Sequence, residues 1–301
     1  MKILLLGASG QVGHALQEPL ANLGTLRACT RTEMDICDHD VMRNQIMELA
    51  PDVIVNAAAY TAVDRAENEA ETAFDVNAVA VKNLAQVANS LGSQLIHYST
   101  DYVFDGTKSG AYTEEDATNP LNVYGKSKLA GEYAIRESGC RHLIFRTTWV
   151  IGSRGNNFVK TILRLAGERD TLSVVADQRG APTSATLIAK VTARAIAAKE
   201  ANQDWGDGLY NLTPSGETNW HELACRIIKI AHGAGLTLRA GKEDLNPIST
   251  AEYPTPAQRP MNSVLDTRKL QSRLTQTLPT WEDDFDQEFQ QIIEGQSRAA
   301  A

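Results

Sequence analysis

The chain has 301 residues, of which 43% are apolar and 22% charged, a composition typical of globular proteins and unlike that of disordered or disulfide-rich chains. Its length allows two domains, or one large α/β domain with an addition. The formal net charge of -8 argues against a nucleic-acid-binding surface, which is usually basic. We therefore expect a globular protein with no nucleic-acid partner, which binds phosphate through a few local donors.

Neither export nor membrane insertion is indicated by the sequence. The apolar run before Gly7 is too short for a signal peptide, and no run approaches the roughly 18 apolar residues of a membrane span. Four cysteines lie far apart, without a Cys-x-x-Cys motif, and are expected to be reduced thiols. These features predict a cytoplasmic protein with no membrane partner.

Short apolar runs alternate with helical patterns through the first half of the chain. Strands are predicted at residues 4–6, 26–30, 52–56, 95–99 and 142–147. Helices are predicted between them, at residues 12–23, 41–49, 71–91 and 124–136. This alternation predicts an α/β fold with a doubly wound parallel sheet, forming a dinucleotide-binding domain over residues 1–150.

The second half of the chain is less regular. Helices are predicted at residues 158–166, 186–198 and 220–232, and a proline-rich extended segment at 247–260. We expect residues 151–301 to form mainly a smaller C-terminal substrate-binding lobe, with some segments returning to the first domain.

A glycine-rich turn, GASGQVG at residues 7–13, follows the first strand and opens the first helix. In that position the backbone of Gly7, Gly10 and Gly13, with Gln11 and Val12 between them, could approach a pyrophosphate. The same turn could also serve tight packing alone. Directly after the third strand come three small side chains, over which a dinucleotide could lie close to the backbone: Ala57, Ala58 and Ala59.

The end of the second strand bears on the choice of cofactor. Enzymes that use NAD carry a carboxylate about 20 residues beyond the glycine turn, whereas an arginine there accommodates the 2′-phosphate of NADP. Here Thr30 and Arg31 stand at that place, which favours NADPH without excluding NADH. The alternative is that Arg31 and Arg27 are solvated surface charges. Asp35 and Ile36 could flank the adenine.

Tyr124 and Lys128 stand four residues apart on a predicted helix and so project from one face. A lysine ammonium near a phenol lowers its pKa, which would make Tyr124 a proton donor to a carbonyl oxygen during hydride transfer. Lys128 could also bond the nicotinamide ribose. The fourth strand ends in Ser99 and Thr100, and because neighbouring strand residues face opposite ways, only one hydroxyl should enter the cleft.

Several longer motifs accompany these residues, among them PDVIVNAAAYTAVDRAE at 51–67, HYSTDYVFDG at 97–106, PLNVYGKSKLAGE at 120–132, DQRGAPT at 177–183 and YPTPAQRPMNSVLD at 253–266. With them the chain resembles the extended short-chain dehydrogenase/reductase family, and within it the reductases that complete dTDP-L-rhamnose synthesis. The resemblance implies a Rossmann fold and NAD(P)H-dependent reduction of the C4 ketone of dTDP-4-dehydro-β-L-rhamnose, the product serving surface polysaccharide. It also implies a dTDP-sugar as small-molecule partner and allows a homodimer.

Site residues follow from the resemblance by position. It implies that Tyr124, Lys128 and Thr100 are catalytic and adds Tyr98 to the cofactor-binding residues. The sugar would be lined by Thr100, Asp101, Val103, Tyr124 and Trp149, and less firmly by Thr61, Val63 and Asp64.

Two of these assignments, and two further residues, have competing interpretations. Trp149 could be a core aromatic, and Asp101 could cap a loop. Arg259 could bind the dTDP pyrophosphate or hold an acidic side chain, and His97 is expected in the core.

No metal site is assigned from the sequence. Some relatives use magnesium, but the chain shows no carboxylate cluster at ligand spacing. Two other functions stay open at this point: a reductase or epimerase of another nucleotide sugar, which would share the catalytic residues, and a regulatory relative of the fold without activity.

Overall fold

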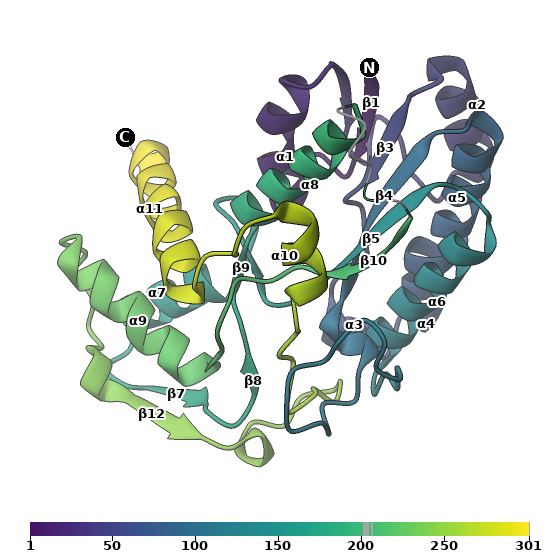
Figure 1. The fold of residues 1–301 in the computed structure, drawn as a ribbon. Coiled ribbons are helices and arrows are strands. Elements are labelled where there is room, and N and C mark those ends of the chain that lie inside the picture. The colour runs from purple at the N-terminus through teal and green to yellow at the C-terminus, as the bar shows by residue number, and fades with distance from the viewer. Residues whose placement is uncertain (201–204, 206, 301) are drawn as a thin grey trace.

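The computed structural model describes residues 1–200, 205 and 207–300. Residues 201–204, 206 and 301, which fall in the range expected for the second lobe, lie outside that description. The centre is a six-stranded parallel sheet in the order β10-β5-β4-β3-β1-β2. Its strands are β1 (Lys2–Leu6), β2 (Thr25–Cys29), β3 (Val53–Asn56), β4 (Gln94–Thr100), β5 (His142–Thr147) and β10 (Gly208–Asn211). The predicted doubly wound fold is confirmed (Figure 1).

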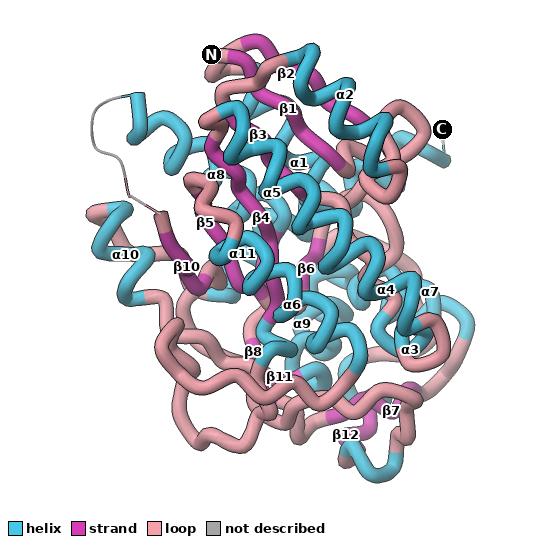
Figure 2. Tube along the Cα trace, turned by 90° about the vertical axis from the view of Figure 1, so that its right-hand side faces the viewer, coloured by secondary structure: helices cyan, strands magenta, loops and turns pink. Residues whose placement is uncertain are grey.

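Helices cover both faces of this sheet, because strand side chains alternate between two apolar cores. Ile3 and Leu5 face a core that contains α1 (Gln11–Ala21) and α8 (Ala185–Glu200). Leu4 and Leu6 face the opposite core. Figure 2 shows the helices on that opposite face, α2 (His39–Leu49), α5 (Ala80–Leu91) and α6 (Val123–Glu137).

One expected helix is interrupted. Residues 71–91 were predicted as a single helix, but α4 (Ala70–Phe74) runs through a π-helical turn at Asp75–Val79 into α5. Asn77 in that turn is fully buried; its side chain accepts from Tyr60 N and donates to Tyr60 O and Ser127 Oγ. The widened turn aims this amide at the segment after β3, which also contains the unpredicted helix α3 (Val63–Ala66).

The smaller lobe lies to one side of the sheet and has its own apolar core (Figure 1). It contains α7 (Phe158–Glu168), α9 (Trp220–Gly233) and α11 (Trp281–Ala300). Its strands are paired as β7 (Leu172–Val175) with β12 (Leu245–Ile248), β8 (Arg179–Gly180) with β11 (Thr218–Asn219), and β6 (Val150–Ile151) with β9 (Thr183–Ser184).

Residues from the second half also complete the sheet layer. β10 pairs with the outer edge of β5, and α10 (Arg268–Leu274) contributes Leu270 and Leu274 to the core that α1 and α8 share. The proline-rich stretch is not extended throughout, since it includes a 3-10 turn at Thr250–Glu252. Further 3-10 turns occupy Asp101–Val103 and Lys242–Asp244. None of the helices in the described residues is both long and apolar enough to cross a bilayer.

A buried ion pair joins α6 to the sheet. Arg146 on β5 donates from Nε and Nη2 to the two carboxylate oxygens of Glu132 at 2.9 and 2.7 Å, with both side chains excluded from solvent. Ser99 on β4 donates to the same carboxylate at 2.5 Å. The two bonds from Arg146 and the one from Ser99 compensate the buried Glu132 carboxylate for its lost hydration, which would otherwise destabilise the fold.

We expect Glu132→Ala to lower the free energy of unfolding by about 3–5 kcal/mol, because it leaves the Arg146 guanidinium buried without a counter-charge. Urea denaturation followed by circular dichroism measures this loss. The matched control is Glu168→Ala, which breaks the exposed Arg164–Glu168 pair and should cost no more than about 0.5 kcal/mol. Equal losses in the two variants would show that the buried pair contributes nothing special.

Candidate active site

The three glycines of the first turn serve different needs. Gly7 has a φ of +75°, and a Cβ there would lie 2.6 Å from Ala58 N. A Cβ on Gly13 would lie 2.0 Å from Gly7 O, so neither position has room for a side chain. Gly10 is exposed, caps α1 without a side-chain hydrogen bond, and its Cβ would meet only Gly7 O at 3.4 Å.

This arrangement fits a dinucleotide pyrophosphate. Packing accounts for Gly7 and Gly13, whereas nothing within the chain requires Gly10 to lack a side chain. Gly10 leaves the backbone open at the N-terminus of α1, where unpaired backbone N–H groups and the helix dipole favour the binding of an anion. Ala57 and Ala58 are half-buried and Ala59 is exposed beside the turn.

Gln11 and Val12, expected in the same turn, also serve the fold. Gln11 Oε1 accepts from Asn157 Nδ2 at 2.8 Å, and Asn157 caps the N-terminus of α7 in the second lobe. Val12 is partly buried against the core beneath α1. The structure therefore connects the glycine-rich turn directly to the first helix of the other lobe.

Beyond β2 the structure brings Thr30, Arg31 and Asp35 into one short turn. Arg31 is 82% exposed and donates to Asp35 Oδ2 at 3.0 Å. Thr30 Oγ1 donates to Glu33 at 2.8 Å, an acid that the sequence interpretation passed over. Ile36 is 5% exposed and packs in the core under α2, so its side chain is not at this surface.

Tyr124 lies in the first turn of α6, beside the last residue of β4. Asn122 caps the helix by accepting from Gly125 N at 2.8 Å. A Cβ on Gly125 would lie 2.2 Å from Tyr102 O, so this glycine lets α6 start directly against the segment that follows β4. The close approach brings the Tyr124 hydroxyl near Thr100, close enough for that side chain to lower the pKa of the phenol.

The two hydroxyls at the end of β4 face opposite sides, as expected. Ser99 bonds Glu132 within the sheet–helix interior, whereas Thr100 donates to Asp101 Oδ1 at 2.9 Å and meets Tyr124. Of the two, the structure brings only Thr100 to Tyr124.

Lys128 is buried one turn beyond Tyr124, and its Nζ lies 3.2 Å from His97 Nε2. His97 Nδ1 in turn lies 3.2 Å from Asn56 Nδ2. Sequence analysis placed His97 in the core and missed its link to Lys128. The signal available was that Asn56 ends β3 and lies opposite His97, in the middle of the neighbouring parallel strand β4.

The electrostatics of this group differ from the expectation. A lysine near Tyr124 was expected to lower the pKa of the phenol, but burial raises it, and the contact with Thr100 only partly opposes that rise. Burial also disfavours the charged form of Lys128 and lowers its pKa to about 8, although the nearby carboxylate of Glu132 acts to raise that pKa. In this structure the phenol is held neutral, with its proton available to a nearby acceptor.

Trp149 lies just after β5, where the chain enters the smaller lobe. Its backbone has a φ of +45°, and its half-buried ring stacks on Trp220 of α9 with centroids 3.7 Å apart. A Cβ on Gly180 would lie 2.8 Å from that ring. A tryptophan in the left-handed region is strained, which indicates that tertiary contacts fix its position.

Three other expected residues are buried. Asp101 is 3% exposed, and burial raises its pKa to about 6. Val103 lies in a small core with Phe104 and Leu129, so its side chain is not brought to Tyr124. Tyr98 bonds Thr192 of α8 through its hydroxyl at 2.8 Å and also lies apart from this group.

A cavity of about 410 Å³ lies between the two lobes beside this group. Phe158, Ile162 and Leu165 of α7 line it together with Trp220, while Asp64, Tyr102, Thr255 and Arg259 line it from the other side. Arg259 donates to both oxygens of Asp64 at 2.6 and 2.8 Å and holds the pKa of that carboxyl below its ordinary value. Of the two roles expected for Arg259, the structure shows the one that holds an acidic side chain.

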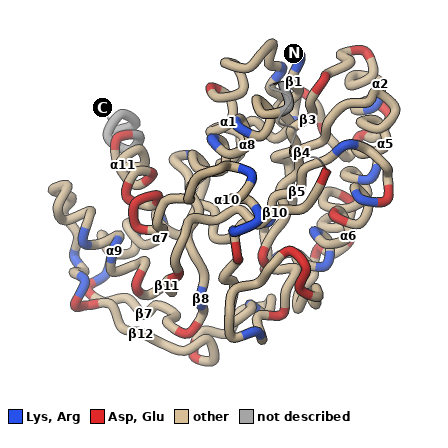
Figure 3. Tube along the Cα trace, in the orientation of Figure 1, with Lys and Arg blue, Asp and Glu red and all other residues tan. Residues whose placement is uncertain are grey.

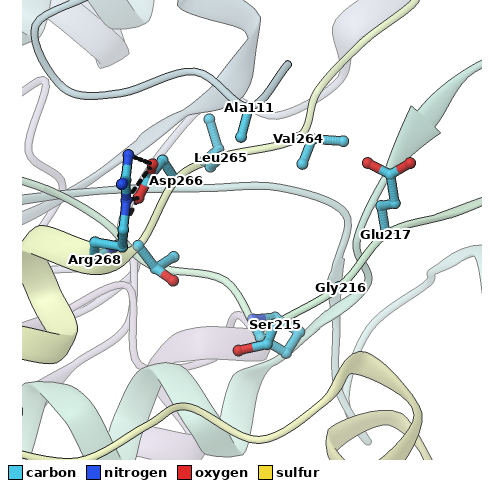
Figure 4. Close-up of a pocket in the computed structure, with 10 residues that line it drawn as sticks. Ala111, Ser215, Gly216, Glu217, Val264, Leu265, Asp266 and Arg268 are labelled. Carbon is cyan, nitrogen blue, oxygen red and sulfur yellow. Dashed lines mark hydrogen bonds and ion pairs between the residues drawn. The ribbon is translucent and has the colours of Figure 1, made fainter. Parts of the chain in front are cut away.

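A second hollow of about 290 Å³ contains none of the expected residues (Figure 4). Its charged side chains are paired, Arg268 with Asp266 and Glu217 with Arg179. Lys and Arg are interspersed with Asp and Glu in the view of Figure 3. Among residues 1–200, 205 and 207–300, no cluster of three or more His, Cys, Asp or Glu side chains could hold a metal ion.

Comparison with known proteins places this geometry in a family. The profile described as RmlD substrate binding domain matches residues 1–293. The dTDP-4-dehydrorhamnose reductase of Salmonella typhimurium is 50% identical over 286 residues, which cover 94% of this chain and 95% of that protein. The enzyme of the same name from Escherichia coli is 49% identical with the same coverage.

Solved structures agree with these sequence matches. A dTDP-4-dehydrorhamnose reductase from Clostridium acetobutylicum superposes with a TM-score of 0.88 at 35% identity, covering 96% of this chain and 99% of that one. The Bacillus anthracis enzyme, solved in complex with NADP, gives 0.86 at 33% identity, with 96% and 98% covered. The chain thus belongs to the dTDP-4-dehydrorhamnose reductase family of extended short-chain dehydrogenases/reductases.

Proposed function

We propose that this chain reduces the C4 ketone of dTDP-4-dehydro-β-L-rhamnose to dTDP-L-rhamnose, the final step of dTDP-L-rhamnose synthesis, with NADPH as the preferred donor. The observation that carries the proposal is the meeting of the Tyr124 and Thr100 hydroxyls at the carboxyl end of β4, beside a cavity that both lobes line. Ligands of open parallel sheets bind outside the carboxyl ends of the strands.

Tyr124 is the proton donor in this reaction. Its phenol is neutral because burial raises its pKa, and Thr100 orients the hydroxyl. A ketone oxygen placed within reach of Tyr124 would accept a hydrogen bond from the phenol and then its proton, while the hydroxyl of Thr100 donates to Asp101. A bound nicotinamide would supply the hydride, so the chain itself has to bind, orient and protonate.

The glycine turn and the turn after β2 would hold the cofactor. Gly10 and the start of α1 suit its pyrophosphate, and Arg31 suits a 2′-phosphate because it is exposed and held only by Asp35. The carboxylates of Glu33 and Asp35 in the same turn leave NADH use open. The residues that we assign to the cofactor thus fall within residues 1–150.

The cavity between the lobes would take the dTDP-sugar. We assign Trp149 to the wall nearest the ketone because its ring stacks on Trp220, which lines the cavity. The residues of α7 that line the cavity would extend the site toward the nucleotide. Thr61, Val63 and Asp64 follow β3 on the same side, and Asp64 lines the cavity. We assign residues 151–301 mainly to the substrate, with β10 and α8 belonging to the sheet layer; the cytoplasmic location and the homodimer remain predictions.

We expect Tyr124→Phe to lower kcat by about 10²-fold or more while the Kd for NADPH changes little, because only the proton donor is lost. Stopped-flow or steady-state NADPH oxidation with the dTDP-4-keto sugar measures kcat, and fluorescence titration measures Kd. Tyr133→Phe, an exposed tyrosine on the same helix, is the matched control and should be silent. Near-normal turnover by Tyr124→Phe would remove Tyr124 from the mechanism.

Arg31→Ala should raise the KM for NADPH more than the KM for NADH, by about tenfold for the loss of one charge-assisted bond to the 2′-phosphate. The control is Arg27→Ala, an exposed arginine within β2, which should leave both KM values unchanged. Steady-state kinetics with both cofactors tests the difference. An equal change for NADPH and NADH would reduce Arg31 to a surface charge.

Trp149→Ala should lower kcat/KM for the dTDP-4-keto sugar by about 10- to 100-fold, since a large rigid wall of the sugar site is removed. The Kd for NADPH should stay the same. Measuring it by fluorescence titration also verifies that the dinucleotide-binding domain of the variant is folded. Unchanged sugar kinetics in the folded variant would make Trp149 a packing residue only.

A further inference from the structure

The amide of Asn56 has only one orientation that satisfies its neighbours. Its Oδ1 accepts from Ala58 N at 3.1 Å. Turning the amide over would oppose two donors, the Ala58 N–H and the Asn56 NH₂. Nδ2 must therefore be the atom that faces His97 Nδ1, at 3.2 Å.

The orientation of Asn56 fixes the tautomer of His97. Because Nδ2 can only donate, His97 Nδ1 must accept and carries no proton. The ring is 1% exposed, and burial lowers its pKa well below the ordinary value, so it is neutral. The single proton of a neutral imidazole then lies on Nε2.

That proton points at Lys128 Nζ, which lies 3.2 Å from His97 Nε2. An ammonium group has three donors and no acceptor, so it cannot accept from Nε2–H, whereas an uncharged amine can. We propose that His97, oriented by Asn56, is a positioning residue that donates Nε2–H to Lys128 and favours its uncharged amine.

The other groups around Lys128 do not reverse this bias. Tyr124 precedes it by one turn of α6 and is neutral. Glu132 follows it by one turn and attracts the ammonium, but its carboxylate is already engaged by Arg146 of β5 and Ser99 of β4. Burial, acting in the same direction as His97, brings the pKa of Lys128 to about 8.

The consequence for activity rests on the proposed function. If the charged lysine supports the reduction, kcat/KM falls as the pH rises through the pKa of Lys128 in the free enzyme. His97 therefore sets the upper pH limit of the enzyme while contacting neither substrate nor the reacting atoms. Without the Nε2–H donor, Lys128 keeps its proton to higher pH.

The tautomer is tested directly by long-range ¹H–¹⁵N correlation spectra of the full chain labelled on histidine. The six histidines give separate ring signals, and the signal absent from His97→Gln belongs to residue 97. We expect an unprotonated Nδ1 and a protonated Nε2 in the wild-type protein. In Asn56→Asp a carboxylate replaces the donor, so the proton should move to Nδ1.

The pH dependence of kcat/KM gives the second readout. In both Asn56→Asp and His97→Gln, Lys128 would face a hydrogen-bond acceptor in place of the Nε2–H donor. The basic limb of the kcat/KM profile should therefore move upward by about one pH unit, so that kcat/KM at a pH above the wild-type limb is about tenfold higher than in the wild type. His142→Gln, on β5 and away from Lys128, should leave the limb in place.

Two results would overturn the inference: a wild-type His97 with its proton on Nδ1, or a basic limb that stays in place in both variants. The tautomer is read without substrate or cofactor. Failure of the proposed function would instead appear as absence of turnover by the wild-type enzyme.

Discussion

The site depends on how closely α6 approaches the sheet. Gly125 allows the start of the helix to touch the backbone at Tyr102, and the Glu132–Arg146 pair fixes its middle to β5. Tyr124 lies directly before the first attachment, and Lys128 lies between the two. Because the helix is held at both points, its side chains stand at fixed heights above the end of β4, as a preorganised site requires.

Most of the sheet and its helices could be predicted from periodicity. β1 and β3 are short, mostly apolar runs, and β4 and β5 each contain an apolar stretch between polar ends; such buried stretches are a strong signal in a parallel sheet. β10 could not be found this way, because a four-residue strand with Gly208 and Asn211 at its ends has little apolar pattern. The π-helical turn was also missed, since its cause is a tertiary contact of Asn77.

The parts of the site that depend only on local backbone geometry could be predicted from the sequence. The spacing of Tyr124 and Lys128 and the opposite facing of Ser99 and Thr100 follow from backbone geometry alone. Partners contributed by distant segments were not predictable: Trp220 beneath Trp149, Asp64 at Arg259, and His97 at Lys128. Ile36, Tyr98 and Val103 were assigned by position along the chain, but burial turns their side chains into apolar cores.

The late arrival of β10 at the sheet edge has a consequence for biosynthesis. A ribosome releases β5 about sixty residues before the strand that covers its outer edge, and the helices α7 and α8 with the short strands between them are made in that interval. During that interval the open backbone of β5 is a template for pairing with other chains. The nascent first half is therefore the stage most exposed to aggregation, and a fragment ending at residue 150 would keep that edge open permanently.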